Sequence, residues 1–313
     1  MVTQGLVKQF GDNRAVDGVD LAIPNGCIYG LLGPNGAGKT TIINILATLL
    51  NSDAGTAKIF GHDVHGEAHV VRQLISVTGQ YAAVDEKLSA SENLVVFGML
   101  LGLSRSDARK RAAQLLEDFG LTEAANKTLD KFSGGMRRRL DIAASLIVQS
   151  PLIFLDEPTT GLDPRTRAQM WNTIKQLVSS GSTILLTTQY LDEADYLADR
   201  IAVIDHGRVV AEGTPSELKA EVGVATLRLG LIDEKDNAEA TRVIETELQV
   251  KSTSPEPMLI TAPMADPERV TDLLIALREA GIRLAKISVQ EPTLDEVFMA
   301  LTGENILVER EAA

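Results

Sequence analysis

The chain has 313 residues, of which 44% are hydrophobic, so it is long enough for about two domains and can bury a full core. Its formal net charge is −13. This acidic balance argues against a nucleic-acid partner, because nucleic-acid binding neutralises many phosphates with Lys and Arg. The N-terminus lacks the apolar core of a signal peptide, and the longest strongly apolar run, residues 94–103, predicts a buried helix rather than a membrane span.

Up to about residue 220, short β-branched apolar runs alternate with helical patterns, which is typical of an α/β fold with a mainly parallel sheet. The run between the first two clear strands, about residues 84–150, has almost no strand pattern and indicates helices. We therefore predict an α/β domain over residues 1–220 with a helical insertion. Its clearest strands are residues 27–32, 152–155, 183–188 and 201–204.

The segment GPNGAGKTT, residues 33–41, follows the first of these strands and has the spacing of a P-loop. Its glycines let backbone N–H groups turn toward phosphate oxygens, Lys39 supplies a mobile positive charge, and the Thr40 hydroxyl can ligate Mg²⁺. The alternative is a chance loop, but this spacing arises by accident in only about one chain in a hundred of this length. We predict a nucleotide site formed by Asn35, Gly36, Ala37, Gly38, Lys39, Thr40 and Thr41.

Two adjacent acids, Asp156 and Glu157, end the predicted strand at residues 152–155. An α/β sheet places its ligand at the carboxyl ends of its strands, and buried acids are unfavourable unless a cation or a reaction needs them. Asp156 is predicted to hold Mg²⁺ through water. Glu157 is predicted to orient or deprotonate an attacking water. The alternative is a solvated turn before Pro158.

The segment FSGGMRRRLD, residues 132–141, predicts a second anion site at the start of a helix. Ser133 is a good N-cap residue, while Gly134 and Gly135 expose the first N–H groups of the helix. Ser-Gly-Gly also begins ordinary helices, so the residues alone leave the ligand of this loop open.

These segments, together with Gln80, GLD at residues 161–163 and TTQ at residues 187–189, occur in the order and spacing of the ATP-binding subunit of ABC transporters, which residues 1 to about 220 resemble. The resemblance implies a P-loop NTPase fold, ATP and Mg²⁺ as cofactors, a separate membrane-spanning permease, and a second ATPase subunit forming a homodimer. It also implies that the loop Ser133, Gly134 and Gly135 contacts ATP bound to the other subunit. A position at the cytoplasmic face of a bacterial plasma membrane follows.

The resemblance implies roles for individual residues as well. Phe10 falls where a ring stacks on adenine, with Val16 beside it, although Phe10 could also be a core residue of a first hairpin. Gln80 resembles the glutamine that touches Mg²⁺ or the attacking water and links the core to the helical insertion. Asp163 matches a loop that signals across the dimer.

Gln189 stands where most such ATPases have a histidine. Glutamine can donate a hydrogen bond to a γ-phosphate oxygen but cannot carry a proton near neutral pH, which leaves Glu157 as the strong candidate base. We expect Glu157, Lys39 and Gln189 to be the catalytic residues. The stretch at residues 187–208 resembles drug-export ATPases of the daunorubicin/doxorubicin-resistance type. Arg137 to Arg139 could support the dimer, face the membrane partner or form a solvated helix face.

Beyond residue 221 the pattern changes to three strand-like runs separated by helical ones, which predicts a separate small α+β domain over residues 222–313. Residues 291–298 resemble a terminal motif of the same transporter subunits, which implies a regulatory or stabilising domain. Two alternatives to a transporter subunit remain at this stage. One is a soluble ABC-type ATPase acting on ribosomes or DNA, and the other is a nucleotide-dependent binding module without turnover.

Overall fold

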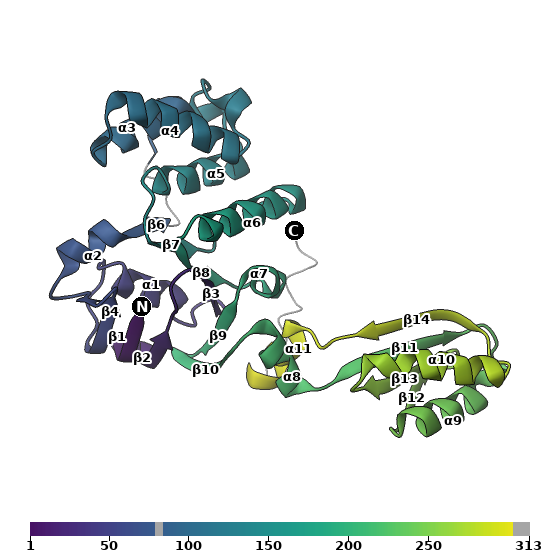
Figure 1. Cartoon of the computed structure of the whole chain (residues 1–313). Coiled ribbons are helices and arrows are strands. Elements are labelled where there is room, and N and C mark those ends of the chain that lie inside the picture. The colour runs from purple at the N-terminus through teal and green to yellow at the C-terminus, as the bar shows by residue number, and fades with distance from the viewer. Residues whose placement is uncertain (79–83, 303–313) are drawn as a thin grey trace. The chain divides into compact units, whose positions relative to one another are not determined.

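A computed structural model describes residues 1–78 and 84–302. The chain divides into two compact units, Met1–Pro215 and Ser216–Ala313. In the first unit a mainly parallel sheet has the strand order β10-β9-β3-β8-β7-β6 (Figure 1). The four strands predicted from the sequence are present in it. Its strands are β3 (Ile28–Leu32), β6 (Ile75–Thr78), β7 (Leu152–Asp156), β8 (Thr183–Thr188), β9 (Arg200–Asp205) and the antiparallel β10 (Arg208–Gly213).

A second sheet at the N-terminus is antiparallel, with the order β2-β1-β4-β5. In the sequence, the pattern of its strands alone does not distinguish them from the strands of the parallel sheet. It is built from β1 (Val2–Phe10), β2 (Asn13–Ala22), β4 (Ala54–Ile59) and β5 (His62–Asp63).

Alternate residues of the central strands pack into two different hydrophobic cores, as period-two strands require. Phe154 of β7 and Leu31 of β3 face the core shared with α1 (Lys39–Leu46), α2 (Ala68–Leu74) and the antiparallel sheet. Ile153 and Leu155 face the core shared with α6 (Pro164–Ser179) and the helical insertion. The sheet is therefore covered on both faces. Its parallel strands place the loops that follow β3 and β7 at the same edge, on either side of the end of β8.

The insertion contains α3 (Ala90–Leu100), α4 (Arg105–Asp118), the short turns η1 (Thr122–Ala124) and η2 (Leu129–Lys131), and α5 (Gly134–Ser145). Ser89 and Glu92 form a capping box that begins α3. The prediction that the run at residues 94–103 is a helix is confirmed as far as Leu100, and the prediction that it is buried holds for one face only, where Leu94 lies in the core and Val95 and Phe97 pack against it. The apolar residues Val96, Met99, Leu100 and Leu101 are exposed, Leu100 by 77%.

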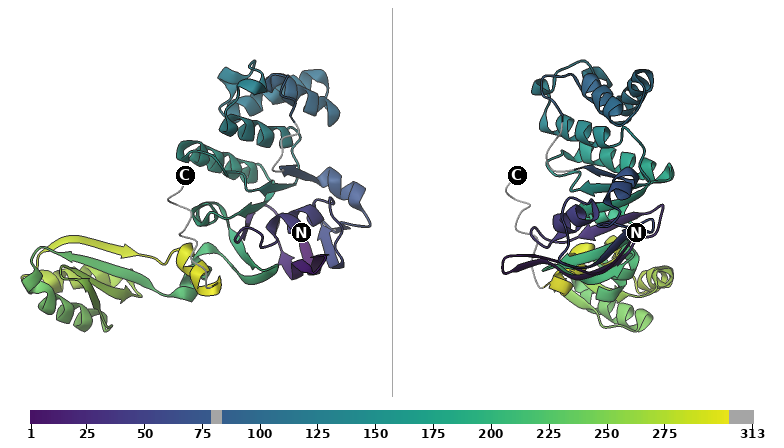
Figure 2. Two further views of the ribbon diagram at one scale, coloured as in Figure 1. Left: turned by 180° about the vertical axis from the view of Figure 1, so that it is seen from behind. Right: turned by 90° about the vertical axis from the view of Figure 1, so that its left-hand side faces the viewer.

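The second unit is an α+β fold in which every neighbouring pair of strands is antiparallel, with the order β12-β13-β11-β14. The chain order β11-α9-β12-β13-α10-β14 is that of a ferredoxin-like unit. Both helices pack on one face of the sheet (Figure 2). The elements of this part of the chain are α8 (Pro215–Val222), β11 (Ala225–Leu231), η3 (Glu234–Asp236), α9 (Asn237–Leu248), β12 (Thr253–Glu256), β13 (Leu259–Met264), η4 (Pro267–Arg269), α10 (Val270–Glu279), β14 (Leu284–Gln290) and α11 (Leu294–Thr302).

In the parts of the chain that the structure describes, no helix combines the length and hydropathy needed to cross a bilayer.

Candidate nucleotide-binding and hydrolysis site

The loop between β3 and α1 curls back so tightly that two of its glycines are required. A Cβ at Gly33 would lie 2.2 Å from the carbonyl oxygen of Ile204, and a Cβ at Gly38 would lie 2.1 Å from the carbonyl oxygen of Ala15. Gly38 also has a φ of +106°, which L side chains rarely adopt. The loop therefore passes close to the backbone of β2 and β9, and its end at Gly38 leads directly into α1.

A polar cavity of about 400 Å³ lies over this loop and the first turn of α1. Its volume is within the range of small-molecule sites, and the N–H groups at a helix N-terminus favour an anionic ligand. Glu157, which directly follows β7 at the same edge of the sheet, also lines the cavity. The lining residues are Phe10, Asn13, Ala15, Asn35, Gly36, Gly38, Lys39, Thr40, Thr41 and Glu157.

Of three residues predicted to contact the nucleotide, Phe10 lines the cavity, whereas Val16 and Ala37 do not. Phe10 lines the cavity and is 50% exposed, so the alternative of a core phenylalanine is wrong. The prediction for Val16 is wrong, because its side chain is fully buried in the core of the antiparallel sheet and Ala15 lines the cavity instead. Ala37 is also buried, and its N–H donates to the carbonyl of Pro34 rather than facing the cavity.

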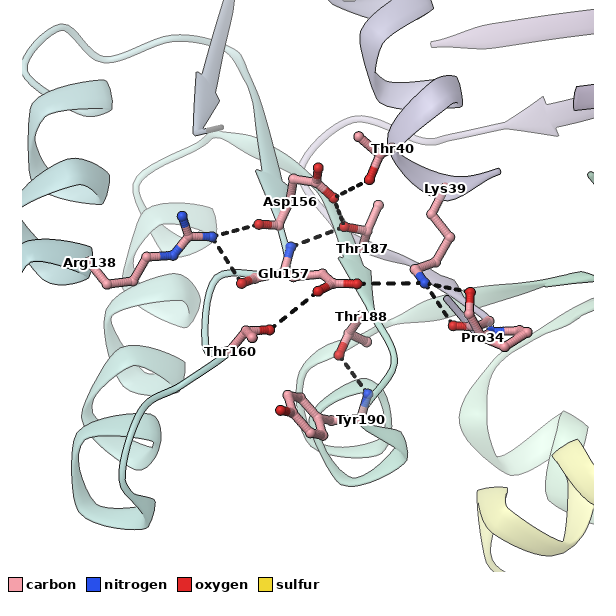
Figure 3. A network of polar contacts seen from close by, with 11 residues as sticks. Pro34, Lys39, Thr40, Arg138, Asp156, Glu157, Thr160, Thr187, Thr188 and Tyr190 are labelled. Carbon is pink, nitrogen blue, oxygen red and sulfur yellow. Dashed lines mark hydrogen bonds and ion pairs between the residues drawn. The ribbon is translucent and has the colours of Figure 1, made fainter. Parts of the chain in front are cut away.

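Lys39 is only 4% exposed and lies inside the curl of the loop. Its Nζ donates to the carbonyl oxygens of Gly33 at 2.8 Å and Pro34 at 3.0 Å, and lies 3.7 Å from Oε1 of Glu157 (Figure 3). Burial lowers the pKa of Lys39, while Glu157 and then Asp156 oppose that shift. The ammonium is thus held at the cavity wall beside a carboxylate.

One carboxylate oxygen of Asp156 accepts hydrogen bonds from two hydroxyl groups. Thr40 Oγ1 donates to its Oδ1 at 3.3 Å, and the hydroxyl of Thr187 in β8 donates to the same atom at 2.5 Å (Figure 3). Hydroxyl and carboxylate oxygens are the donor set that Mg²⁺ prefers, with waters and substrate phosphates completing the shell. Thr40 and Asp156 therefore fit a magnesium ion, and Asp156 is only 4% exposed.

Glu157 adopts a left-handed backbone, with a φ of +47°. This conformation is uncommon for a residue with a long side chain, and such strain gathers at functional sites. Its N–H donates to both the carbonyl and the hydroxyl oxygen of Thr187 at 3.1 Å, which holds the turn in place. The Thr160 hydroxyl donates to Oε2 at 3.4 Å. The carboxylate is thereby presented to the cavity, where a general base for water would be needed.

Arg138 is a site residue that the sequence reasoning missed. From α5 its Nη2 donates to the carbonyl oxygens of Asp156 at 2.6 Å and Glu157 at 2.9 Å (Figure 3), and its Nε donates to that of Pro158 at 3.4 Å. Burial lowers the pKa of this guanidinium, and nearby carboxylates oppose the shift. Arg138 therefore joins the helix behind the Ser-Gly-Gly loop to the end of β7.

The neighbouring arginines also have partners in their own chain, but Arg137 and its partner are partly exposed, so the alternative of a solvated helix face stays open for Arg137. Arg137 forms an ion pair with Glu86 at 2.5 Å, and Arg139 donates to the carbonyl of Phe119 at 2.9 Å. All three arginines of this run contact their own chain. No local sequence signal identifies these partners, because each lies about 20 or more positions away.

The remaining predicted residues lie outside the cavity of their own chain. Ser133 caps α5 by accepting from the N–H of Met136 at 3.2 Å, and both Ser133 and Gly134 are exposed while Gly135 is half-buried. Asp163 caps α6 by accepting from the N–H of Thr166 at 3.0 Å.

Two glutamines, Gln80 and Gln189, are predicted to contact Mg²⁺, the attacking water or the γ-phosphate. Gln189 is half-buried directly after β8 and does not line the cavity. Gln80 lies outside the described residues. The predicted roles of Gln80 and Gln189 stay predictions.

Comparisons with known proteins agree with this geometry. Residues 16–160 match the ABC transporter family, and residues 213–302 match the family described as ATP-binding protein DrrA1-3-like, C-terminal domain. The chain is 56% identical, over 96% of its length and 92% of the relative's, to the daunorubicin/doxorubicin resistance ATP-binding protein DrrA of Streptomyces peucetius. It is 36% identical, over 97% of its length and 98% of the relative's, to the linearmycin resistance ATP-binding protein LnrL of Bacillus subtilis (strain 168).

A solved structure of a dimeric ATP-binding cassette, in a post-hydrolysis state with ADP and Pi, superposes with a TM-score of 0.63 at 27% identity. The match covers 68% of this chain and 97% of that one. The predicted fold class is confirmed, since the neighbour is an ABC cassette and the rest of the chain is accounted for by the C-terminal family. The chain therefore belongs to the ABC transporter family and is an ATP-binding, ATP-hydrolysing subunit of the DrrA type.

Proposed function

We propose that this subunit uses Mg-ATP to drive the export of a drug-like or lipophilic substrate through a separate membrane permease. It would act as a homodimer at the cytoplasmic face of the plasma membrane. The observation that carries the proposal is that Lys39, Thr40 and Glu157 line one cavity, with Asp156 bonded to Thr40 behind it, while the Ser133 loop of the same chain lies outside it. The names of the relatives, which are resistance proteins for daunorubicin, doxorubicin and linearmycin, support an export role.

Catalysis by these residues is mostly positioning and charge stabilisation. Lys39 and the first N–H groups of α1 would neutralise the β- and γ-phosphates. Glu157 would hold or deprotonate the attacking water within reach of the γ-phosphorus. Thr40 and, through water, Asp156 would hold Mg²⁺, which would supply stabilisation of the negative charge that develops during phosphoryl transfer.

The second half of the phosphate cradle is expected from the other subunit. Ser133, Gly134 and Gly135 begin a helix of 12 residues and lie at its exposed N-terminus. Such a terminus is suited to a phosphate, and no cavity residue of the same chain comes from this loop. ATP held between two copies would favour closure, and loss of the γ-phosphate would favour opening.

The helical insertion is the expected docking site of the permease. The exposed end of α3, with Val96, Met99, Leu100 and Leu101, is apolar. Clustered exposed apolar residues often mark protein contacts.

We further propose that residues 1–220 form the nucleotide-binding domain, with the insertion at about residues 84–150, and that residues 222–313 form an accessory domain. The ribosome or DNA alternative finds no support in the relatives named above.

The proposal is tested in inside-out membrane vesicles that contain the chain and a candidate permease. ATP-dependent accumulation of doxorubicin, followed by its fluorescence, should require both proteins and should be lost with Glu157→Gln. ATP hydrolysis by the purified chain should rise when the permease is added. Hydrolysis that does not respond to any membrane protein, with no accumulation of substrate, would contradict the transport role while leaving the ATPase activity intact.

A further inference from the structure

Glu193 is a fully buried acid in the first turn of α7 (Leu191–Leu197), and the chemistry described above makes no use of it. Its Oε1 accepts from the Thr159 hydroxyl at 2.8 Å and from the indole N–H of Trp171 at 3.1 Å. Burying a carboxyl group is unfavourable unless hydrogen bonds compensate for the lost water. A carboxylate kept at this place therefore points to a role beyond packing.

The three residues of this contact belong to three segments that each carry a site residue. The hydroxyl donor lies in the loop two positions after Glu157. The indole donor lies in α6, whose N-cap is Asp163. The acceptor lies in α7, which begins two positions after Gln189. One buried oxygen thus joins the segment of the expected base, the segment expected to face the other subunit, and the segment of the expected phosphate sensor.

Other contacts already hold α6 against α7. The guanidinium of Arg167 lies 4.8 Å from the ring centroid of Tyr190 and 3.5 Å from the carboxylate of Asp192. The rings of Trp171 and Tyr196 stack at 4.9 Å. These groups could keep the two helices together without Glu193. The carboxylate of Glu193 adds a hydrogen bond to Thr159, in the loop that follows Glu157.

We propose that Glu193 is a positioning residue for ATP hydrolysis, whose carboxyl oxygen fixes the loop after Glu157 relative to α6 and α7. A shift in any one segment is then passed to the other two. The link to the loop and to α6 needs a hydrogen-bond acceptor rather than a charge, because the Thr159 hydroxyl and the Trp171 indole both donate to Oε1. Burial raises the pKa of Glu193 and its hydrogen bonds oppose that rise, and Oε1 can accept in either protonation state.

The test compares Glu193→Ala with Glu193→Gln in the full chain, measuring kcat and KM for ATP per mole of folded protein. Glu193→Ala should lower kcat by about 10- to 100-fold, since misplacement of catalytic groups has effects of that size. The KM should change by less than about threefold, because the network does not contact the P-loop residues that bind phosphate. Glu193→Gln retains the acceptor oxygen and should restore kcat to near the wild-type value.

The matched control is Lys175→Ala. Its ammonium lies 3.6 Å from the ring centroid of Tyr196 at the same helix interface but does not contact the loop, so kcat should not change. Thr159→Val removes only the hydroxyl that donates to Glu193 and should also lower kcat. This variant tests the proposal if Glu193→Ala does not fold. A wild-type kcat in Thr159→Val or in folded Glu193→Ala, or a Gln variant as slow as the Ala variant, would overturn the proposal.

Discussion

The hydroxyl oxygen of Thr40 lies 3.3 Å from Oδ1 of Asp156, although 116 positions separate the two residues in the chain. The parallel sheet brings them together, because β3 and β7 both pair with β8 and their carboxyl ends lie at the same edge. Thr187, at the end of the strand between them, donates to the same carboxylate oxygen. The proposed metal-binding pair is therefore built from the first turn of α1 and the end of β7, and Thr187 of β8 holds it in place.

Asp156→Asn should abolish the response of ATP hydrolysis to Mg²⁺ while leaving the fold intact. The amide oxygen can still accept from Thr40 and Thr187, but the negative charge that attracts the cation is lost. We expect kcat to fall by about 100-fold or more, measured as phosphate release across a Mg²⁺ titration. Asp107→Asn, an exposed acid in the first turn of α4, is the control. An unchanged Mg²⁺ dependence in Asp156→Asn would exclude the assigned metal ligand.

Glu157→Gln should retain ATP and lose hydrolysis. The substitution keeps the length of the side chain, so Lys39 and the loop can still bind phosphate, but a carboxamide cannot accept the proton of water. Turnover should drop by about 10²- to 10⁴-fold. The variant should accumulate as a dimer with Mg-ATP, measured by light scattering. A variant that stays monomeric at saturating Mg-ATP would count against a shared site.

Local patterns were enough to predict the four central strands of the parallel sheet and the phosphate loop. The strand at residues 183–188 is buried at every position, and such a run is recognisable from its apolar residues alone. The P-loop could be located because its spacing encodes a backbone shape, with Gly33 and Gly38 where any side chain would collide.

What the sequence could not reveal depends on which surfaces are covered. The sequence of α3 shows that the run is apolar but not which surface would cover it, and Leu100 is exposed in the structure. The family resemblance implies that Val16 lies beside Phe10 at the nucleotide, but successive residues of a strand point to opposite faces, and in β2 Ala15 faces the cavity while Val16 faces the core. Arg138 was not recognised because its acceptors are backbone carbonyls at the end of β7.

Gly134→Glu should prevent the ATP-dependent dimer of the Glu157→Gln chain without preventing ATP binding. A Cβ at Gly134 meets no atom within 4 Å, so the subunit should fold, while the new carboxylate would repel a phosphate approaching the N-terminus of α5. Gly223→Glu is the matched control, since a Cβ there also meets nothing within 4 Å. Light scattering with Mg-ATP should show monomers for the first variant and dimers for the second. Equal dimer formation in both would contradict the role of the Ser133 loop.

Gln189→Ala should slow hydrolysis while leaving nucleotide affinity nearly unchanged. The side chain follows β8 and does not line the cavity, so its expected contact is with the γ-phosphate in the closed dimer. Loss of one hydrogen bond to a charged group corresponds to about a tenfold fall in kcat. Steady-state phosphate release measures this, with nucleotide binding followed separately. Wild-type turnover in Gln189→Ala would refute a catalytic role for the glutamine.

Asp141→Asn should stabilise the protein above pH 6 and lose that advantage as the pH falls. Burial raises the pKa of Asp141 to about 6, although Arg138 and Arg137 lower it, and its Oδ1 has no hydrogen-bond partner among the described residues. The unfolded chain, with a carboxyl pKa near 3.8, binds the proton less tightly than the folded chain. Ionised Asp141 therefore destabilises the fold, fully above pH 6 and not at all below about pH 4.

The expected gain in the free energy of unfolding at pH 8 is about 1–3 kcal/mol, from roughly two pKa units at 1.4 kcal/mol each with allowance for partial exposure. Urea unfolding at pH 8, 5 and 4 measures it, and the gain should be smaller at pH 5 than at pH 8 and should vanish near pH 4. Glu117→Gln, at an exposed position of α4, controls for removing a negative charge in general. A gain of the same size at every pH would show that Asn stabilises α5 for reasons other than the buried charge.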